Sequence, residues 1–122
     1  MFRSLLIVAL GMMALSSCRK SEDPTPVQDQ DWFSTSQPGA TGYTIYSTTP
    51  PIGRGYAGFR LNSDGTYLEY APAPADGQEE RPGTWQAEGK LTYRITFRDA
   101  TRPGYQLRIK NPSAEHLEAR MD

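Results

Sequence analysis

The sequence predicts an all-β domain, a small antiparallel meander that closes into a barrel, with a β-sandwich as the alternative. Two observations lead to this class. From Trp32 onward, apolar residues recur at every second position in several short segments, and turn sequences separate these segments. None of this part of the chain has the apolar spacing of a helix of about ten residues, so an α/β arrangement is not expected.

The clearest strand pattern spans residues 91–98, where one face would consist of Leu91, Tyr93, Ile95 and Phe97. The same alternation marks residues 105–110 and residues 116–121, and in the last of these His116 and Glu118 would point outward. Further strands are expected, in chain order, at residues 32–33, 43–46, 58–61, 65–70 and 83–87. Seven or eight short strands in so short a chain favour a closed sheet, because closure removes exposed strand edges.

The segments between these strands have the composition of turns. Residues 62–65 read Asn-Ser-Asp-Gly, and Gly65 can take the positive φ that a tight turn requires. Residues 71–82, which contain three prolines, are the longest connection, and we expect an irregular loop there. Short turns join antiparallel neighbours, which is why a meander is the expected order.

The run from Phe59 to Tyr67 reads Phe-Arg-Leu-Asn-Ser-Asp-Gly-Thr-Tyr, and Gly83-Thr84-Trp85 follows it. This arrangement resembles small bacterial lipocalin-like domains, in which a hairpin with Asp-Gly-Thr and an aromatic residue precedes Gly-x-Trp. The resemblance covers roughly residues 58–121 and implies a lipocalin-like barrel. The chain departs from lipocalins proper at Trp32, which has no glycine two residues before it.

The first residues have the order of a secretory signal: Arg3, an apolar run over residues 5–15, and small residues before Cys18. The run is 11 residues long, whereas a membrane-spanning helix needs roughly 20. Leu15-Ser16-Ser17-Cys18 resembles the lipobox of bacterial lipoproteins. The resemblance implies cleavage before Cys18 and a lipid anchor on its sulfur. The alternative is a plain secretory signal with a chance cysteine.

Three parts of the chain are therefore expected: a lipoprotein signal peptide at 1–17, the lipidated Cys18 with a disordered tether at 18–31, and the β domain at 32–122. Val27 is the only clearly apolar residue of the tether, and such a segment cannot bury enough surface to offset its ordering entropy. Since Arg19 follows Cys18 where lipoproteins kept at the inner membrane tend to have Asp, the resemblance implies a cell-envelope protein of the outer membrane.

Composition narrows the functional classes. The chain has 13 Lys and Arg against 14 Asp and Glu, so it lacks the basic stripe that nucleic-acid binding needs. It has a single cysteine and a single histidine, His116, so neither a metal site nor a cofactor is expected. Residues 53–58 match the Gly-x-Gly-x-x-Gly pattern, but a strand follows them rather than the helix that a dinucleotide site requires.

Catalysis is not expected either. No nucleophile motif is present, and the paired carboxylates Glu79 and Glu80 would lie in a polar loop rather than in an apolar cleft. A basic strip of outward residues on two strands is expected to be a solvated face, with an anionic lipid surface as the alternative partner; it comprises Arg94, Arg98, Arg108 and Lys110.

The remaining hypothesis is non-catalytic binding of a small apolar or amphipathic ligand at a barrel mouth. Its candidate residues are Tyr56, Tyr67 and Tyr70, since tyrosine brings an apolar ring and a polar tip to a pocket rim. The alternative is an interaction or inhibitor protein that acts on another envelope protein, through residues 71–82 and the outer face, with no ligand cavity. A small barrel is compatible with both, because its own side chains can fill it.

Overall fold

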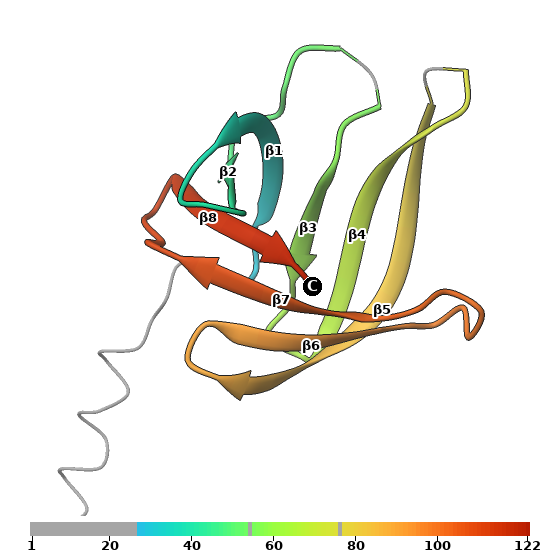
Figure 1. The fold of residues 1–122 in the computed structure, drawn as a ribbon. Coiled ribbons are helices and arrows are strands. Elements are labelled where there is room, and N and C mark those ends of the chain that lie inside the picture. Colours follow the sequence, from blue (N-terminus) through green and yellow to red (C-terminus); the bar gives the residue numbers. More distant parts are fainter. Residues whose placement is uncertain (1–26, 54, 76) are drawn as a thin grey trace, which may run out of the picture.

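The computed structural model describes residues 27–53, 55–75 and 77–122, and in these residues the chain forms an eight-stranded closed antiparallel barrel (Figure 1). The predicted all-β class and the closed barrel are confirmed, and the sandwich alternative is not. The strands are β1 (Asp31–Pro38), β2 (Thr44–Ser47), β3 (Gly58–Leu61), β4 (Thr66–Ala73), β5 (Gly77–Gly89), β6 (Thr92–Phe97), β7 (Tyr105–Lys110) and β8 (His116–Met121).

The strands β3 to β8 form the expected meander, and the β1–β2 hairpin closes the circle in an inverted position. Around the barrel β1 pairs with β3, while β2 pairs with β8. Phe33 on β1 is opposite Ser47 on one side and Gly58 on the other, so the connection between β2 and β3 must cross β1. The Ser34 N–H donates to the Ala57 carbonyl at 2.9 Å and holds the end of this connection against β1.

The barrel interior is filled by side chains. The largest fully buried ones come from the N-terminal segment and from six strands, namely Val27, Trp32, Phe59, Leu61, Tyr67, Ile95, Leu107 and Leu117. Phe59 lies 5.2 Å from Tyr46 and 6.3 Å from Tyr67 between ring centroids, and Tyr67 continues the contacts to Phe97 and Tyr105. Stacked and edge-on rings of this kind fill the narrow centre of a small barrel.

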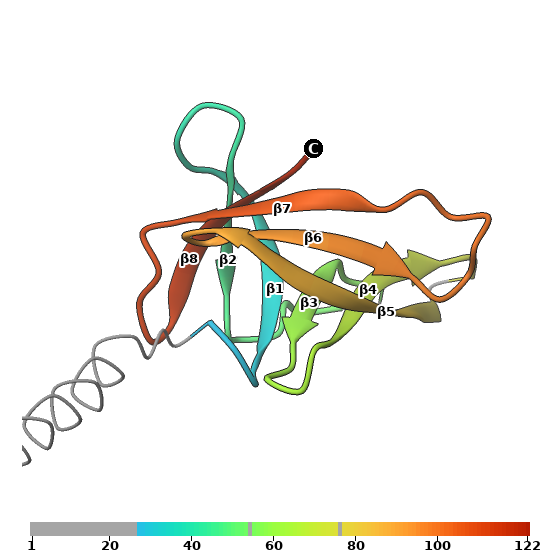
Figure 2. The ribbon, with the colours of Figure 1, turned by 90° about the horizontal axis from the view of Figure 1, so that it is seen from below.

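The two ends of the barrel differ. At one end of the barrel β3 ends and β4 begins, and we call it the closed end. At the other end β3 begins and β4 ends, and we call it the mouth (Figures 1 and 2). At the closed end Val27 is fully buried, and its carbonyl accepts a hydrogen bond from the Trp32 indole N–H at 2.9 Å. The Asp29 N–H also donates to the Leu61 carbonyl, at 2.7 Å.

These contacts correct the expected domain boundary. The sequence predicts a disordered tether that includes residues 27–31, but Val27 belongs to the core and β1 begins at Asp31. One apolar side chain suffices here because it is fully buried in a cavity at the closed end of the barrel, and burial of a valine contributes roughly 1.5–3 kcal/mol. The composition of a short polar segment does not reveal such a cavity.

The expected irregular loop at residues 71–82 is a second correction. β4 runs on to Ala73 and β5 begins at Gly77, so most of this segment is a β-hairpin in continuous register from Thr66↔Thr84 to Ala73↔Gly77. In Figure 1 the two strands rise together, away from the connection between β6 and β7. Backbone hydrogen bonds form this ladder, and Pro72 and Pro82 fit in it where an N–H would point away from the partner strand.

Most of the predicted facings are confirmed. Tyr93, Ile95 and Phe97 are buried, as are Leu117 and Ala119, whereas His116 is exposed. Met121 is an exception, since it is 37% exposed at the end of β8. Residues 55–58 lead into β3, as the sequence predicted for the Gly-x-Gly-x-x-Gly match.

Candidate functional site: the barrel mouth

A pocket of about 210 Å³ opens at the mouth of the barrel, above the filled interior. Five strands, and the residue before β3, contribute to its lining, which consists of Tyr46, Ala57, Gly58, Glu69, Tyr70, Ala71, Tyr105 and Met121. The alanines and Met121 give it apolar walls, while Glu69 and the tyrosine hydroxyls give it polar atoms. This combination suits a small amphipathic molecule.

A chain of hydrogen bonds links the interior to this pocket. The hydroxyls of Tyr67 and Tyr105 are 2.7 Å apart, and the Tyr105 hydroxyl donates to Glu69 at 2.6 Å. The second carboxylate oxygen of Glu69 accepts a hydrogen bond from Arg81 at 2.8 Å, and Arg81 also bonds Glu79 at 2.9 Å. Glu69 points inward because it lies opposite both Phe59 and Arg81 across the ladders.

The environment keeps the phenols protonated. Burial raises the pKa of Tyr46 to about 12, with a smaller contribution from the charge of Glu69. Burial also raises the pKa of Tyr67 and that of Tyr105 well above the usual value for tyrosine. Both hydroxyls therefore remain hydrogen-bond donors at neutral pH, and Tyr105 directs its proton to Glu69.

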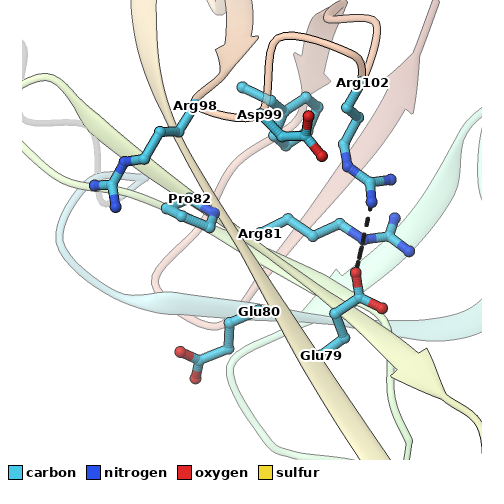
Figure 3. Close-up of a pocket in the computed structure, with 8 residues that line it drawn as sticks. Glu79, Glu80, Arg81, Pro82, Arg98, Asp99 and Arg102 are labelled. Carbon is cyan, nitrogen blue, oxygen red and sulfur yellow. Dashed lines mark hydrogen bonds and ion pairs between the residues drawn. The ribbon is translucent and has the colours of Figure 1, made fainter.

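A second pocket, of about 280 Å³, lies on the other side of Arg81, between β5 and the connection from β6 to β7 (Figure 3). Its lining consists of Glu79, Glu80, Arg81, Pro82, Phe97, Arg98, Asp99 and Arg102. Arg102 reaches across the pocket to Glu79 at 3.6 Å, and its guanidinium lies 5.9 Å from the centre of the Phe97 ring. Figure 3 shows this pair on one side of β5, with Glu80 and Arg98 on the other.

The structure separates the three tyrosines that the sequence placed together. Tyr67 is buried inside the barrel, with 1% of its surface exposed. Tyr56 and Tyr70 lie on the outer face, where both rings contact Phe33. Of the three, Tyr70 also reaches the rim of the mouth pocket.

The outer aromatic cluster of Phe33, Tyr56 and Tyr70 covers Gly58. Phe33 and Tyr70 are the cross-strand neighbours of Gly58 on its two sides, and their rings stack with centroids 6.1 Å apart. A Cβ at Gly58 would lie 2.3 Å from the Trp32 carbonyl oxygen, so glycine is required where the two strands approach. The Tyr70 hydroxyl donates to Asp31 at 2.6 Å, which fixes this ring to β1.

The predicted basic strip is exposed on β6, on β7 and just after β6, and acids balance part of it. Arg94 pairs with Glu88 at 3.4 Å, and Arg108 pairs with Asp122 at 3.1 Å. Lys110 lies over the Tyr43 ring, 4.7 Å from its centre. These contacts fit the expectation of a solvated face.

The sequence reasoning missed Glu69 and Tyr105, the two residues that connect the interior to the mouth. A signal was present, because Tyr67, Glu69 and Ala71 share one face of the β4 alternation, and a carboxylate on an inward face calls for a partner. The partner strands of β4 were needed to identify that face as the inner one.

Within the described residues, no three or more His, Cys, Asp or Glu side chains are grouped to hold a metal ion. This part of the chain also contains no helix of the length and apolar character that crossing a membrane requires. The signal peptide at 1–17 and the lipidation residue Cys18 lie outside the described residues.

Comparison with known proteins adds no family to this geometry. Neither a protein-family model, nor a curated protein, nor a solved structure matches the chain.

Proposed function

We propose that this chain is a lipid-anchored protein of the bacterial cell envelope, held at the outer membrane by acyl chains on Cys18. The support is the order of Arg3, the short apolar run and Leu15-Ser16-Ser17-Cys18. Two or more acyl chains hold a protein firmly at a bilayer, whereas one holds it only reversibly. A triacylated N-terminus would therefore keep the barrel at the membrane.

The anchor is tested with Cys18→Ala in a cell that processes lipoproteins. We expect the wild-type chain to incorporate labelled palmitate and to sediment with membranes, and the variant to lose both properties. Since the chain has no other cysteine, no second thiol can replace the first. Continued labelling of Cys18→Ala would exclude the anchor.

The function that the geometry supports best is non-catalytic binding of a small apolar or amphipathic ligand at the barrel mouth. The observation that carries this proposal is the pocket of about 210 Å³ with apolar walls, the Glu69 carboxylate and tyrosine hydroxyls. The filled interior below it limits the ligand to the mouth. The volume is below the roughly 300–1,000 Å³ of drug-sized sites, so the expected ligand is small.

Binding is tested with three six-carbon probes that share a chain and differ in head group: hexan-1-ol, hexylamine and hexanoate. Amide shifts are followed by NMR in the wild type and in Ala71→Phe, which places a ring in the pocket. Thr84→Phe adds the same ring on an exposed position of β5 and serves as the control. We expect Ala71→Phe to weaken the best probe at least tenfold and the control to leave it unchanged. Equal weakening in both variants would contradict the site.

A second candidate function, an interaction or inhibitor protein, is favoured by a different observation. Eight side chains with less than 2% exposure pack inside the barrel, as in small barrels that their own side chains fill. A domain with such an interior acts through its surface. The two candidates are separated by native mass spectrometry of the purified protein, because a bound small molecule adds mass and a protein partner requires a second chain.

The place where the chain enters the barrel supports a mouth directed away from the anchoring membrane. Val27 lies at the closed end, opposite the mouth. The eight residues between Cys18 and Val27 let these two residues lie at most about 30 Å apart when the chain is fully extended. An anchor at Cys18 therefore favours contact of the closed end with the bilayer, and leaves the mouth open to ligands or partners.

A further inference from the structure

The first residues of β5 have a neighbouring strand on one side only. Its pairing with β6 begins at Gly83↔Phe97, whereas its pairing with β4 continues to Ala73↔Gly77. Among the described residues, no strand pairs with residues 77–82 on the side away from β4. Such an edge is a template for another strand.

The direction of the backbone groups on this edge follows from two hydrogen bonds. The Arg98 N–H donates to the Pro82 carbonyl at 2.9 Å, so residue 82 faces β6. The Trp85 N–H donates to the Gly65 carbonyl at 3.0 Å, so odd-numbered residues face β4. Since facing repeats every two residues, the N–H and C=O groups of Gln78 and Glu80 point to the open side.

The Gln78 side chain contacts the chain segment that leads into β3. The Gln78 side-chain amide accepts from the Tyr56 N–H at 2.8 Å and donates to the Tyr56 carbonyl at 2.9 Å. It also donates to the Ala71 carbonyl at 3.1 Å. The Gln78 side chain thus links β5 to the residues that precede β3, whereas no described side chain bonds the backbone groups of Gln78 and Glu80 on the open side of β5.

The pocket of about 280 Å³ runs along this open edge, and the connection between β6 and β7 forms its far wall. Hydrogen bonds hold this connection in one conformation. The Asp99 carboxylate accepts from the Thr101 N–H at 3.0 Å and from the Thr101 hydroxyl at 2.7 Å, and the Asp99 carbonyl accepts from the Arg102 N–H at 3.0 Å. After Arg98 the chain turns away from β5. The space is therefore the continuation of β6 that the chain itself leaves empty.

The partners of the charged side chains around this space determine which groups remain for an occupant. Arg81 is committed to Glu69 and Glu79, and Asp99 is held by Thr101. Arg102 lies over the Phe97 ring and makes a 3.6 Å ion contact with Glu79, whose carboxylate already accepts from Arg81. Its side chain forms no hydrogen bond with a described residue. On the outer side Arg98 and Glu80 form no ion pair with any described residue, and their opposite charges offset each other. The inner side has no excess positive charge, since Arg81 and Arg102 face Glu69, Glu79 and Asp99. The guanidinium donors of Arg102 are nevertheless the groups on this side that are left to bond an acceptor.

We propose that the β5 edge at residues 78–82 accepts an extended peptide of a partner protein as an additional antiparallel strand, with an acidic side chain opposite Arg81 and beside Arg102. The peptide exchanges backbone hydrogen bonds with Glu80 and Gln78. Its acidic residue forms the cross-strand pair that oppositely charged neighbours favour. This site goes beyond the small-ligand proposal, does not depend on it, and names the partner class of the second candidate function.

The probe is the pentapeptide acetyl-Thr-Glu-Thr-Val-Thr-amide, titrated into the ¹⁵N-labelled full chain in detergent and followed by NMR. In the aligned register its Glu lies opposite Arg81 and its third residue opposite Glu80. Two matched peptides isolate the contributions: one carries Lys in place of Glu, and one is N-methylated at the third residue, which removes a backbone donor while keeping the charge.

We expect saturable amide shifts at Gln78 and Glu80 with the Glu peptide, at least fivefold weaker binding of the Lys peptide, and no saturation with the N-methylated peptide. Before peptide is added, the amides of Gln78 and Glu80 should exchange with solvent faster than those of Glu79 and Arg81. Protected Gln78 and Glu80 amides in the free protein, or equal binding of the N-methylated peptide, would overturn the proposal.

Two variants complete the test. Glu80→Pro removes the edge N–H, and the precedent of Pro82 at the same facing indicates that the β4–β5 ladder tolerates it. Glu80→Thr keeps the N–H and removes only the charge. We expect the proline variant to lose peptide binding and the threonine variant to retain it, with both keeping the wild-type amide spectrum away from the β4–β5 hairpin. Peptide binding by Glu80→Pro equal to wild type would exclude strand addition.

Discussion

The two ends of the barrel differ in the side chains that fill them: one end is apolar and the other is polar. At the closed end Val27 and Trp32 fill the space, and one hydrogen bond between them satisfies the indole N–H. At the mouth the inward positions carry Tyr105, Glu69 and Arg81, which are joined by short hydrogen bonds and remain partly accessible. Buried apolar side chains at the closed end stabilise the fold. The polar side chains at the mouth lie next to solvent, so their hydrogen bonds can be replaced by hydrogen bonds to a ligand.

The largest effect is expected at the closed end. Trp32→Ala should lower the free energy of unfolding by about 3–5 kcal/mol, because it leaves a large cavity and removes the donor to Val27. Denaturant unfolding measures the change. Trp32→Phe, which keeps most of the volume, should cost clearly less. Equal stability of the two variants would show that the Trp32 ring does not stabilise the closed end by filling it.

The next effect concerns the first ordered residues. A domain that starts at Trp32 should be about 2–4 kcal/mol less stable than one that starts at Val27, since it loses a buried side chain and the acceptor of the indole N–H. The melting temperatures of the two purified domains provide the comparison. Identical values would return residues 27–31 to the tether.

A smaller loss is expected at the mouth. Glu69→Leu should cost about 1–3 kcal/mol, because the Tyr105 hydroxyl and Arg81 lose their common acceptor. Glu69→Gln keeps an acceptor for Tyr105 and should lose less. Chemical denaturation of both variants measures the difference, and a leucine variant as stable as wild type would show that the network serves binding alone.

The smallest effect is a change in titration. Arg81 lowers the pKa of the Glu79 carboxyl below its usual value, with a further contribution from Arg102. The stabilisation from this pair is therefore complete above the usual carboxyl pKa and is lost as the pH falls through the lowered value. Arg81→Met should raise the pKa of Glu79 toward the ordinary range in an NMR titration, and an unchanged pKa would assign the shift to another group.

Much of the fold was predictable because its signals are local. The alternation of Tyr93, Ile95 and Phe97 marks a strand with one buried face, and the sequence around Gly65 marks a turn. Residues 71–82 were not predictable in the same way. Their ladder depends on backbone groups, which every residue carries, so the side-chain pattern does not record it.

The candidate site was less predictable than the fold. Tyr70 could be named as a candidate rim residue, but Tyr67 lies in the core, and Glu69 and Tyr105 were not singled out. Whether a residue faces the interior near the mouth depends on its neighbours on adjacent strands. Those neighbours are dozens of residues away in the chain, as with Tyr67 and Tyr105.

The sequence by itself determined the strand content, the turns, the single core and the expectation of an anchor at Cys18, because each of these depends on residues close together in the chain. Only the tertiary structure decided that β1 and β2 close the barrel in inverted order and that Val27 is buried at one end. It also decided that β5 extends beyond the residues that pair with β6. These features depend on which strands pair, although they are far apart in the sequence, and on where the pairing stops. Because the peptide groups that form these hydrogen bonds are the same in nearly every residue, the order of the side chains does not reveal the pairing.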